Sequence, residues 1–583
     1  MTGLLPRIHS PADVRSLPES DLPRLCEELR EEIITVCGRV GGHLGASLGA
    51  VELVVGLHRV FHSPQDALLF DVGHQAYAHK LLTGRRERMG TLRQAGGIAP
   101  FLDPRESPLD ALAAGHSCTA VSAALGMLQG RRQLGRTGHV VAVLGDGALT
   151  GGLSFEGLNN AGGSHLPLVV LLNDNQMSIS ANVGAIPALL RTRQARAFFE
   201  ALGFTYLGPV DGHDLGALLP VLREARQSSR PVVVHAMTQK GRGFPPAEAD
   251  TQTRGHAMGP YEWRAGKLVR SRGGQRTFSE AFAAALDDAM AVDPRVVVVT
   301  PAMLEGSALV ELKARYPDRV HDVGIAEQHA VTFCAGLAAA GARPVCAIYS
   351  TFLQRAFDQV VHDVCLPGLP VLFAVDRAGL VGADGATHQG TYDVSSLRAL
   401  PGLSLMAPVV GEDLAPMLAN ALAAPGPSVI RFPRGTLPAL PPELRAAGTG
   451  SAQGARWLRR AESPRLTLVA LGPLVLAALE AAQGEPGWSV LDARWVSPLD
   501  VPALLEAAAC GHVVVVEEGT VRGGLGSAVL ELYAMHGLSP RVRLMGLPDA
   551  FVPHGDARTQ RSELGLDAAG MRQAGRALLE MGR

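Results

Sequence analysis

The sequence lacks several features that would indicate other classes of protein. It has no block of lysines and arginines, and its 53 basic and 55 acidic residues give a formal net charge of −2. Nucleic-acid-binding proteins normally carry a basic face or arm, so this class is disfavoured and any anionic ligand must be held by local contacts. Apolar runs such as VVVVT have the length of a strand, and none approaches the roughly 20 residues of a membrane span.

The N-terminus and the cysteines also lack the patterns of a secreted protein. The first stretch, MTGLLPRIHSPADVRSLPESDL, is interrupted by prolines and acids before an apolar run reaches the length of a signal sequence. We therefore expect a cytoplasmic protein. The seven cysteines contain no CxxC pair, which predicts reduced thiols that serve packing. These cysteines are Cys26, Cys37, Cys118, Cys334, Cys346, Cys365 and Cys510.

No GxGxxG motif opens the first βαβ unit with an acid at the expected distance, which argues against a nicotinamide dehydrogenase. The chain also has no low-complexity tract and no short internal repeat. What it does have is 67 glycines and 39 prolines spread along 583 residues, 47% of which are hydrophobic. A chain of this length is too long for one hydrophobic core, so a multidomain enzyme is the starting expectation.

Short β-branched runs that end in Gly, Asp or Asn alternate with Ala- and Leu-rich helical stretches, which predicts an α/β fold with parallel sheets. The alternation is lost at about 241–275 and 433–461, and we interpret both stretches as linkers. We predict three domains, each a mostly parallel sheet flanked by helices. Their ranges are 1–265, 276–435 and 462–583.

The strongest local signal is VVAVLGDGALTGGLSFEGLNNAGG followed by LPLVVLLNDNQMSIS. Two neighbouring strands should end near Gly145 and at Asn173 to Asn175, with a helix at about Gly151 to Ala161 between them. Asp146 and Asn175 would then meet at the carboxyl edge of one sheet. With the backbone carbonyl of Met177 they form a hard-oxygen set that suits Mg²⁺. The amides of Gly147 and Ala148 can approach a diphosphate at this turn.

Other segments place polar residues where a ligand could be bound. GGHLGASLGAVEL, DVGHQAYAHK and AAGHSCTAVSAALG each set a polar residue beside glycine, although a single histidine more often has a structural role. Glu327 stands where a helix begins, a position that also suits a merely stabilising acid. Arg377 and Arg434 follow strand-like runs, and paired guanidinium groups suit a phosphate monoester.

GDG followed by NDNxMSIS resembles the motif shared by thiamine-diphosphate enzymes of the transketolase superfamily. From about Gly38 to the C-terminus, the chain is similar to the 1-deoxy-D-xylulose-5-phosphate synthase family. The resemblance implies a transketolase-like fold with thiamine diphosphate and Mg²⁺ as cofactors. It implies cofactor contacts from His74, Gly115, His116, Ser117 and Phe352, the last by stacking on the pyrimidine. It also implies that Glu327 bonds N1′ of the aminopyrimidine and that His43 faces the reacting carbons.

The same resemblance implies condensation of pyruvate with D-glyceraldehyde 3-phosphate, with loss of CO₂, to give 1-deoxy-D-xylulose 5-phosphate. This product is a precursor of isoprenoids, thiamine and pyridoxal. His43 and His388 are the candidates for proton transfer at the carbonyl oxygens. The expected substrate pocket is lined by Tyr349, Arg355, Arg377, Asp384, His388 and Arg434.

The sequence departs from the family pattern at two places. After NVGAI the family usually carries a long segment, yet here only PALLRTRQARAFFE precedes ALGFTYLGPVDGHD. In KGRGFPPAEADTQTRGHAMGP, Phe244 replaces the usual tyrosine and the spacing to His256 is altered. We keep Phe244 as an expected neighbour of the cofactor, while donor contacts from this loop are in doubt.

Two other functions remain open at this point. One is a transketolase-like enzyme with another acceptor, and the other is a non-catalytic paralogue that only binds the cofactor. Retention of Asp146, Asn175 and Glu327 argues against the paralogue, because binding alone has no chemical need for the glutamate. The superfamily also implies a homodimer, and the C-terminal domain shows no site that can be argued from its residues.

Overall fold

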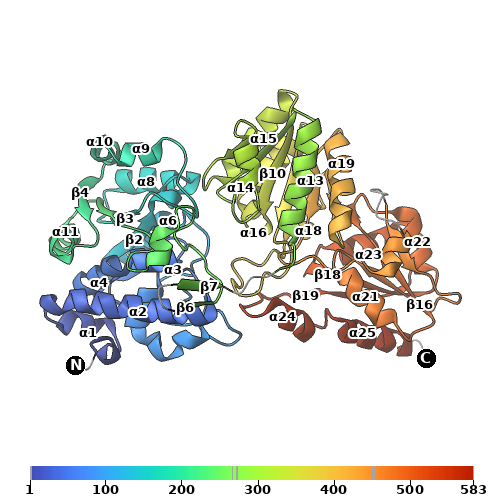
Figure 1. The fold of residues 1–583 in the computed structure, drawn as a ribbon, viewed down its shortest axis with the longest axis horizontal. Coiled ribbons are helices and arrows are strands. Elements are labelled where there is room, and N and C mark those ends of the chain that lie inside the picture. Colours follow the sequence, from blue (N-terminus) through green and yellow to red (C-terminus); the bar gives the residue numbers. More distant parts are fainter. Residues whose placement is uncertain (1–2, 265–266, 271–273, 448–453, 582–583) are drawn as a thin grey trace. The chain divides into compact units, whose positions relative to one another are not determined.

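The computed structural model describes residues 3–264, 267–270, 274–447 and 454–581. The chain divides into two compact units (Figure 1). Unit 1 comprises residues 1–273 with 324–326, and unit 2 comprises residues 274–323 with 327–583. Each unit is built from sheets flanked by helices, which confirms the predicted α/β class.

Unit 1 contains a five-stranded sheet in the order β1-β2-β3-β5-β4, in which all neighbouring strands are parallel. Alternate residues of a strand face opposite sides, so both faces of β2 are covered by apolar cores. The parallel arrangement brings the carboxyl ends of all five strands to one edge. The strands are β1 Ala67–Phe70, β2 Val140–Gly145, β3 Val169–Asp174, β4 Thr205–Asp211 and β5 Val232–Met237.

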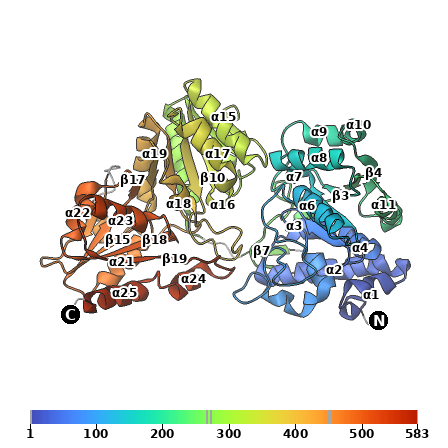
Figure 2. The same cartoon turned by 180° about the vertical axis from the view of Figure 1, so that it is seen from behind.

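Helices cover both faces of this sheet. The helix α6 packs on β2 and α8, on the face seen in Figure 2, and α11 packs on β4 and β5. The helices are α1 Pro11–Ser16, α2 Leu22–Val40, α3 Leu44–Gly49, α4 Val51–Val60, α5 Tyr77–Lys80, α6 Ala120–Gln133, α7 Asp146–Leu149, α8 Gly152–Ser164, α9 Ile186–Leu190, α10 Gln194–Ala201, α11 Leu215–Gln227 and α12 Pro245–Ala249.

The stretch at 241–275, interpreted above as a linker, contains folded structure in its described part. Besides α12 it holds an antiparallel hairpin of β6 Tyr261–Arg264 and β7 Lys267–Arg270. The Tyr261 hydroxyl donates to the carbonyl of Ile34 in α2 at 2.9 Å. This end of the predicted linker therefore packs on unit 1.

Unit 2 contains a seven-stranded sheet in the order β17-β12-β13-β11-β10-β8-β9. All pairs are parallel except β12 with β17. The strands are β8 Val296–Thr300, β9 Val320–Asp322, β10 Arg343–Tyr349, β11 Leu372–Asp376, β12 Ser404–Met406, β13 Ser428–Arg431 and β17 Trp495–Ser497.

A five-stranded sheet forms the C-terminal part of unit 2, in the order β14-β16-β15-β18-β19, with β14 antiparallel to β16. One apolar cluster contains both Leu405 and Val429 of the central sheet and Val469 and Leu491 of the C-terminal sheet. The two sheets therefore share a core. The strands are β14 Arg456–Arg459, β15 Leu466–Ala470, β16 Trp488–Asp492, β18 His512–Thr520 and β19 Arg541–Leu547.

The helices of unit 2 flank these two sheets, with α15 on β10 and α23 on β18. They are α13 Phe278–Val292, α14 Val310–Arg315, α15 Glu327–Ala339, α16 Ser350–Leu353, α17 Phe357–Gln359, α18 Asp393–Leu397, α19 Leu414–Ala423, α20 Pro442–Ala447, α21 Leu474–Ala482, α22 Val501–Ala508, α23 Leu525–Met535, α24 Ala557–Glu563 and α25 Ala568–Glu580. The predicted linker at 433–461 thus includes α20 and β14. The predicted domain limits stay a prediction.

Within the described ranges, no helix combines the length and apolarity needed to cross a membrane. All seven cysteines lie in those ranges and none forms a disulfide. Five of them are buried, which agrees with their predicted role in packing.

Candidate active site

The predicted metal ligands lie together at the carboxyl edge of the unit 1 sheet. β2 and β3 pair in register with Gly145 opposite Asn173, so Asp146 and Asn175 both follow the ends of adjacent strands. The side-chain amide of Asn182 donates to Oδ2 of Asp146 at 2.8 Å. The backbone amide of Met177 donates to Oδ1 of Asn175 at 3.1 Å. The sequence therefore placed these two strand ends correctly.

The surroundings of Asp146 fit a cation. Its side chain is buried, and no hydrogen bond of normal geometry reaches Oδ1 from the described residues. Burial and the neighbouring Asp174 carboxyl raise the pKa of Asp146 well above its usual range, against the opposing effect of the Gln176 and Asn175 amides. A bound divalent cation would offset both causes and take up the open oxygen. Among the described residues no group of three or more His, Cys, Asp or Glu forms an alternative metal centre.

The glycines around Asp146 are required by close packing. A Cβ on Gly147 would lie 2.8 Å from the Cβ of Ser178, and a Cβ on Gly151 would lie 2.3 Å from the Sγ of Cys118. Asp146 itself opens the short helix α7, so the GDG turn is followed by a helical turn before α8 begins. The backbone here packs closely on Ser178 and Cys118. The contact of the Gly147 and Ala148 amides with a diphosphate stays a prediction.

A histidine cluster lies in the same unit. The His43 ring centroid is 6.1 Å from that of His74, 5.7 Å from that of His256 and 5.2 Å from that of Phe101, while His74 and His256 are 5.4 Å apart. Burial, together with nearby positive charge, lowers the pKa values of His74 and His256 well below the usual range. Their buried Nδ1 atoms have no hydrogen-bond partner in the described chain, so both neutral rings are open to a ligand.

His256 joins this cluster beside His43 and His74, although the sequence did not select it as a site residue. The doubt about donor contacts from its loop to the cofactor is not tested by these ring contacts. Phe244 itself is buried in the core, where its ring contacts Tyr261 and Trp263. The structure therefore shows packing for Phe244, and its predicted place beside the cofactor stays a prediction.

The segment with Gly115, His116 and Ser117 is fixed by Asp71, which the sequence did not single out. Asp71 follows β1, and its carboxylate accepts hydrogen bonds from the amides of Cys118 at 2.8 Å and Ala120 at 3.0 Å. It thereby holds the start of α6 immediately after the predicted cofactor residues. An acid directly after the apolar run ALLF was the available signal.

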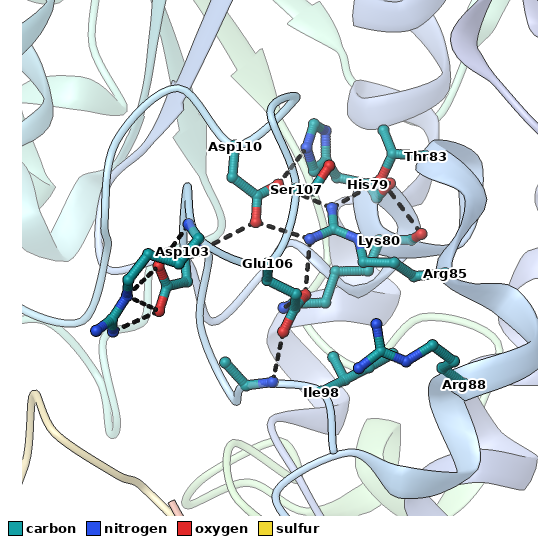
Figure 3. Close-up of polar contacts among 12 residues, drawn as sticks. His79, Lys80, Thr83, Arg85, Arg88, Ile98, Asp103, Glu106, Ser107 and Asp110 are labelled. Carbon is teal, nitrogen blue, oxygen red and sulfur yellow. Dashed lines mark hydrogen bonds and ion pairs between the residues drawn. The ribbon is translucent and has the colours of Figure 1, made fainter. Parts of the chain in front are cut away.

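A buried ionic network holds the segment 99–110 (Figure 3). Arg85 donates to both carboxylate oxygens of Asp110, at 2.7 and 2.8 Å, and to Glu106 at 2.7 Å. Glu106 also accepts a hydrogen bond from the amide of Ala99 at 2.6 Å. Since Phe101 belongs to this segment and contacts His43, the network also fixes one wall of the histidine cluster.

The short stretch after Ile186 is folded. It forms α9 and α10, and Leu190, Ala195 and Phe199 are buried in the core that also covers β2 and β3. Arg191 donates to the side chain of Gln176 at 2.6 Å, which ties this stretch to the loop after β3. The shortened connection is therefore a packed element of unit 1.

In unit 2, Glu327 is the first residue of α15 and is only 4% exposed. Nη1 of Arg355 donates to its Oε2 at 3.1 Å. The structure thus joins the predicted catalytic acid to a residue predicted for the substrate pocket. A buried carboxylate held by one guanidinium can keep a defined orientation toward a ligand.

Four other predicted residues form a stacked group after β10 and β11. The guanidinium of Arg377 lies 3.9 Å from the ring centroid of Tyr349, which stacks on Phe352 at 5.6 Å. His388 packs edge-on against Phe352 at 5.4 Å. Burial raises the pKa of Tyr349 to about 12, so its hydroxyl stays protonated at neutral pH.

Arg434 and Asp384 complete this group in unit 2. Arg434 donates to Oδ2 of Asp384 at 2.9 Å. The charge of Arg434 acts to lower the pKa of Tyr349, and that of Asp384 acts to raise it. Gly306, which the sequence gave no reason to select, lies against Tyr349, because a Cβ there would be 1.6 Å from the Tyr349 hydroxyl. The residues predicted for metal and diphosphate therefore lie in unit 1, and those for pyrimidine and substrate lie in unit 2.

Comparisons with known families agree along the chain. The model described as 1-deoxy-D-xylulose-5-phosphate synthase matches residues 5–197 and 191–238, in two pieces that meet at the shortened segment. The transketolase pyrimidine-binding domain matches 275–439, and the transketolase C-terminal domain matches 455–571. Transketolase from Leishmania mexicana aligns with 96% of this chain and 97% of its own at 18% identity and a TM-score of 0.46, too loosely to inform the site.

Curated relatives are similar over their full length. The 1-deoxy-D-xylulose-5-phosphate synthase of Myxococcus xanthus is 82% identical over 582 residues, which cover 100% of both chains, so the short form also occurs there. The synthase of Anaeromyxobacter sp. (strain Fw109-5) is 49% identical, with 99% of each chain covered. That alignment spans 633 positions, more than this chain has, so the relative carries segments that are absent here. The chain belongs to the 1-deoxy-D-xylulose-5-phosphate synthase family and is a transketolase-type transferase.

Proposed function

We propose that the protein condenses pyruvate with D-glyceraldehyde 3-phosphate, releases CO₂ and forms 1-deoxy-D-xylulose 5-phosphate, with thiamine diphosphate and Mg²⁺ as cofactors. Family membership supports the reaction in general. The observation that carries the proposal is the buried Glu327 at the start of α15, held by Arg355. A protein that only bound the cofactor would have no need for this acid.

Residues of unit 1 would hold the diphosphate and the metal. Asp146, Asn175 and the Met177 carbonyl supply oxygen ligands, and the open Oδ1 of Asp146 supports this assignment. The amides of Gly147 and Ala148 would donate hydrogen bonds to the diphosphate. When bound, thiamine diphosphate supplies the electron sink for loss of CO₂. The remaining predicted contacts come from His74, Gly115, His116 and Ser117.

Residues of unit 2 would manage the proton and the substrates. With the cofactor bound, Glu327 would share a proton with N1′ of the aminopyrimidine, and its burial would keep water from competing for that proton. Phe352 offers its ring to the pyrimidine. Arg377 and Arg434 bind the phosphate of the aldehyde, and Asp384 orients Arg434 at 2.9 Å.

Histidines would serve the carbonyl oxygens of the two substrates. His43 acts from unit 1, beside the neutral His74 and His256. His388 acts from unit 2, beside Phe352 and close to Tyr349. Each histidine can donate a hydrogen bond where negative charge develops on oxygen.

The test is a steady-state assay with both substrates and both cofactors, with the product identified by mass spectrometry. We expect 1-deoxy-D-xylulose 5-phosphate from the wild type and a loss of roughly 10²- to 10⁴-fold in kcat for Glu327→Gln, because this variant cannot exchange the proton. Glu311→Gln is the control, since Glu311 is an exposed acid in the first turn of α14. Wild-type turnover by Glu327→Gln would contradict the proposal, and cofactor binding without this product would show that the acceptor is wrong.

We also infer a homodimer from membership in this superfamily. Light scattering should give a mass of about twice the 61.1 kDa of one chain. A fully active monomer would overturn this inference.

A further inference from the structure

The loop of residues 377–391 carries three of the predicted substrate residues, Arg377, Asp384 and His388. Its two ends are joined by a pair of backbone hydrogen bonds between Gly379 and Gly390, each 2.7 Å long. The side chains on the loop make the contacts with Tyr349, Phe352 and Arg434 described above. What fixes the backbone of this loop therefore also fixes the predicted phosphate pocket.

The backbone of the loop is held by the C-terminal part of unit 2. Oε1 of Glu518, in β18, accepts a hydrogen bond from the Leu380 amide at 2.8 Å. Gly379 packs so closely on Glu518 that a Cβ there would lie 2.8 Å from the Glu518 side chain. Arg561, in α24, donates to both Glu518 oxygens, at 2.8 and 3.0 Å. The Glu518 side chain is only 10% exposed, so its charge is balanced within the protein, by its ion pair with Arg561 and by the nearby charge of Arg431.

Backbone contacts extend this support along the loop. The Thr520 amide donates to the carbonyl of Thr391 at 3.0 Å, and the Gly555 amide donates to the carbonyl of Gly382 at 3.3 Å. The Gln389 side chain donates to the carbonyl of Pro553 at 3.3 Å. Both ends and the middle of the loop therefore rest on residues 518–520 and 553–561.

We propose that Glu518 and Arg561 are positioning residues for the aldehyde substrate, through which the C-terminal domain sets the affinity of the phosphate pocket. This inference rests on the proposed function, because it assumes that the loop binds the phosphorylated aldehyde. Neither residue touches the substrate. The pair holds the Leu380 amide and so keeps Arg377 and Asp384 in place.

The variant Glu518→Gln tests this role. The side-chain oxygen of glutamine can still accept a hydrogen bond from the Leu380 amide. Its NH₂ group, however, faces the Arg561 guanidinium and carries no negative charge to balance it. We expect KM for D-glyceraldehyde 3-phosphate to rise by about tenfold, the size of one lost charged hydrogen bond, while KM for pyruvate and activation by thiamine diphosphate do not change. General destabilisation would not separate the two substrates in this way.

Glu531→Gln is the control for the loss of an arginine-paired carboxylate away from the loop, at a side chain that is 60% exposed. Arg398 donates to both oxygens of Glu531, at 3.0 and 2.6 Å, and this pair also joins the central and C-terminal parts of unit 2. Neither residue belongs to the 377–391 loop. The control should leave both KM values unchanged.

Hydrogen exchange of the loop gives a readout that does not depend on the reaction. Peptides covering 377–391 should exchange faster in Glu518→Gln than in Glu531→Gln, and Arg561→Lys should lie between the wild type and Glu518→Gln. Equal exchange in the two glutamine variants, or an unchanged KM for the aldehyde, would overturn the positioning role. The proposed function can fail separately. If the wild type makes no 1-deoxy-D-xylulose 5-phosphate but Glu518→Gln still speeds exchange in the loop, the assigned substrate is wrong, while the support of the loop by Glu518 and Arg561 is confirmed.

Discussion

At the scale of single residues, Gly306 occupies a position where a methyl group has no room. The added Cβ would lie 1.6 Å from the hydroxyl of Tyr349 and 3.3 Å from Nη2 of Arg377. Tyr349 is buried and stacked, so it cannot move away without breaking its contacts with Phe352 and Arg377. The cost of relieving the overlap is about 1–3 kcal/mol.

We therefore expect Gly306→Ala to lower the thermal midpoint of unit 2 and to raise KM for the aldehyde. Gly336→Ala is the control, because Gly336 is exposed on α15 and nothing lies within 4 Å of its Cβ position. That change should stabilise the helix by about 0.5–1 kcal/mol. Calorimetry and steady-state kinetics check both variants, and unchanged kinetics in Gly306→Ala would show that the Tyr349 group does not form the pocket.

The sequence identified residues that belong to a recognisable motif. It missed residues whose role depends on which side chains lie next to them in the folded protein. Asp146 and Asn175 could be paired because parallel strands end at one edge, and β2 and β3 do so. His256 was not selected from the sequence as a site residue, since loop geometry is not encoded in residue counts. Gly306 gave no signal, because its constraint comes from a side chain 43 positions away in the sequence.

At the scale of elements, the segment 99–110 is held by buried charges. Asp110 accepts from Arg85 and contacts Nε2 of His79 at 3.1 Å, and its side chain has no exposed surface. Although burial acts to raise it, His79 and Arg85 hold the pKa of Asp110 well below its usual range. Asp110→Asn removes one of the two carboxylate charges that balance Arg85, the other being that of Glu106. Breaking a buried pair costs up to about 3–5 kcal/mol.

The expected result for Asp110→Asn is a lower thermal midpoint and faster hydrogen exchange at 99–110. Arg105→Met is the matched control on the same segment, because Arg105 pairs with Asp103 while 79% exposed. Such a surface pair contributes less than about 1 kcal/mol. If both variants exchanged equally at 99–110, the network in Figure 3 would not be what orders this segment.

The alternation of strands and helices predicted the elements of both units better than it predicted the connections. The expected strand ending at Gly145 and the helix after Gly151 correspond to β2 and α8. α7 was missed because a four-residue helix has no apolar period to detect. β6, β7 and α12 were missed because the hairpin and helix are short and lie in a polar stretch.

At the scale of the whole molecule, the two units should respond differently to acid. In unit 1, burial lowers the pKa values of five histidines, which are His58, His74, His79, His139 and His256. In unit 2, burial raises the pKa of Asp376 to about 6 and that of Asp492 to about 7. The overall net charge of −2 gives no hint of this contrast, since it depends on which groups are buried.

The sign of each effect follows from which state binds the proton. Below about pH 6.5 the unfolded histidines take up protons that the folded ones do not. The stability of unit 1 therefore decreases as the pH is lowered, by at most about 1.4 kcal/mol per pH unit for each histidine. The raised pKa of Asp146 opposes this loss in part. Between pH 7 and about 4, folded Asp492 and Asp376 bind protons that their unfolded forms release, so these two groups stabilise unit 2 in acid. Among the described residues of this unit, they act against a single histidine with a pKa lowered by burial, His321.

Native-state hydrogen exchange at pH 7.5, 6.5 and 5.5, corrected for the intrinsic exchange rate, should show this divergence. We expect protection to decrease in the strands of unit 1 and to hold or increase in those of unit 2 as the pH falls. The variant Asp492→Asn should remove part of the gain in unit 2 and leave unit 1 unchanged, because only the group with the raised pKa is lost. A parallel loss of protection in both units would show that the buried histidines and aspartates do not set the acid response.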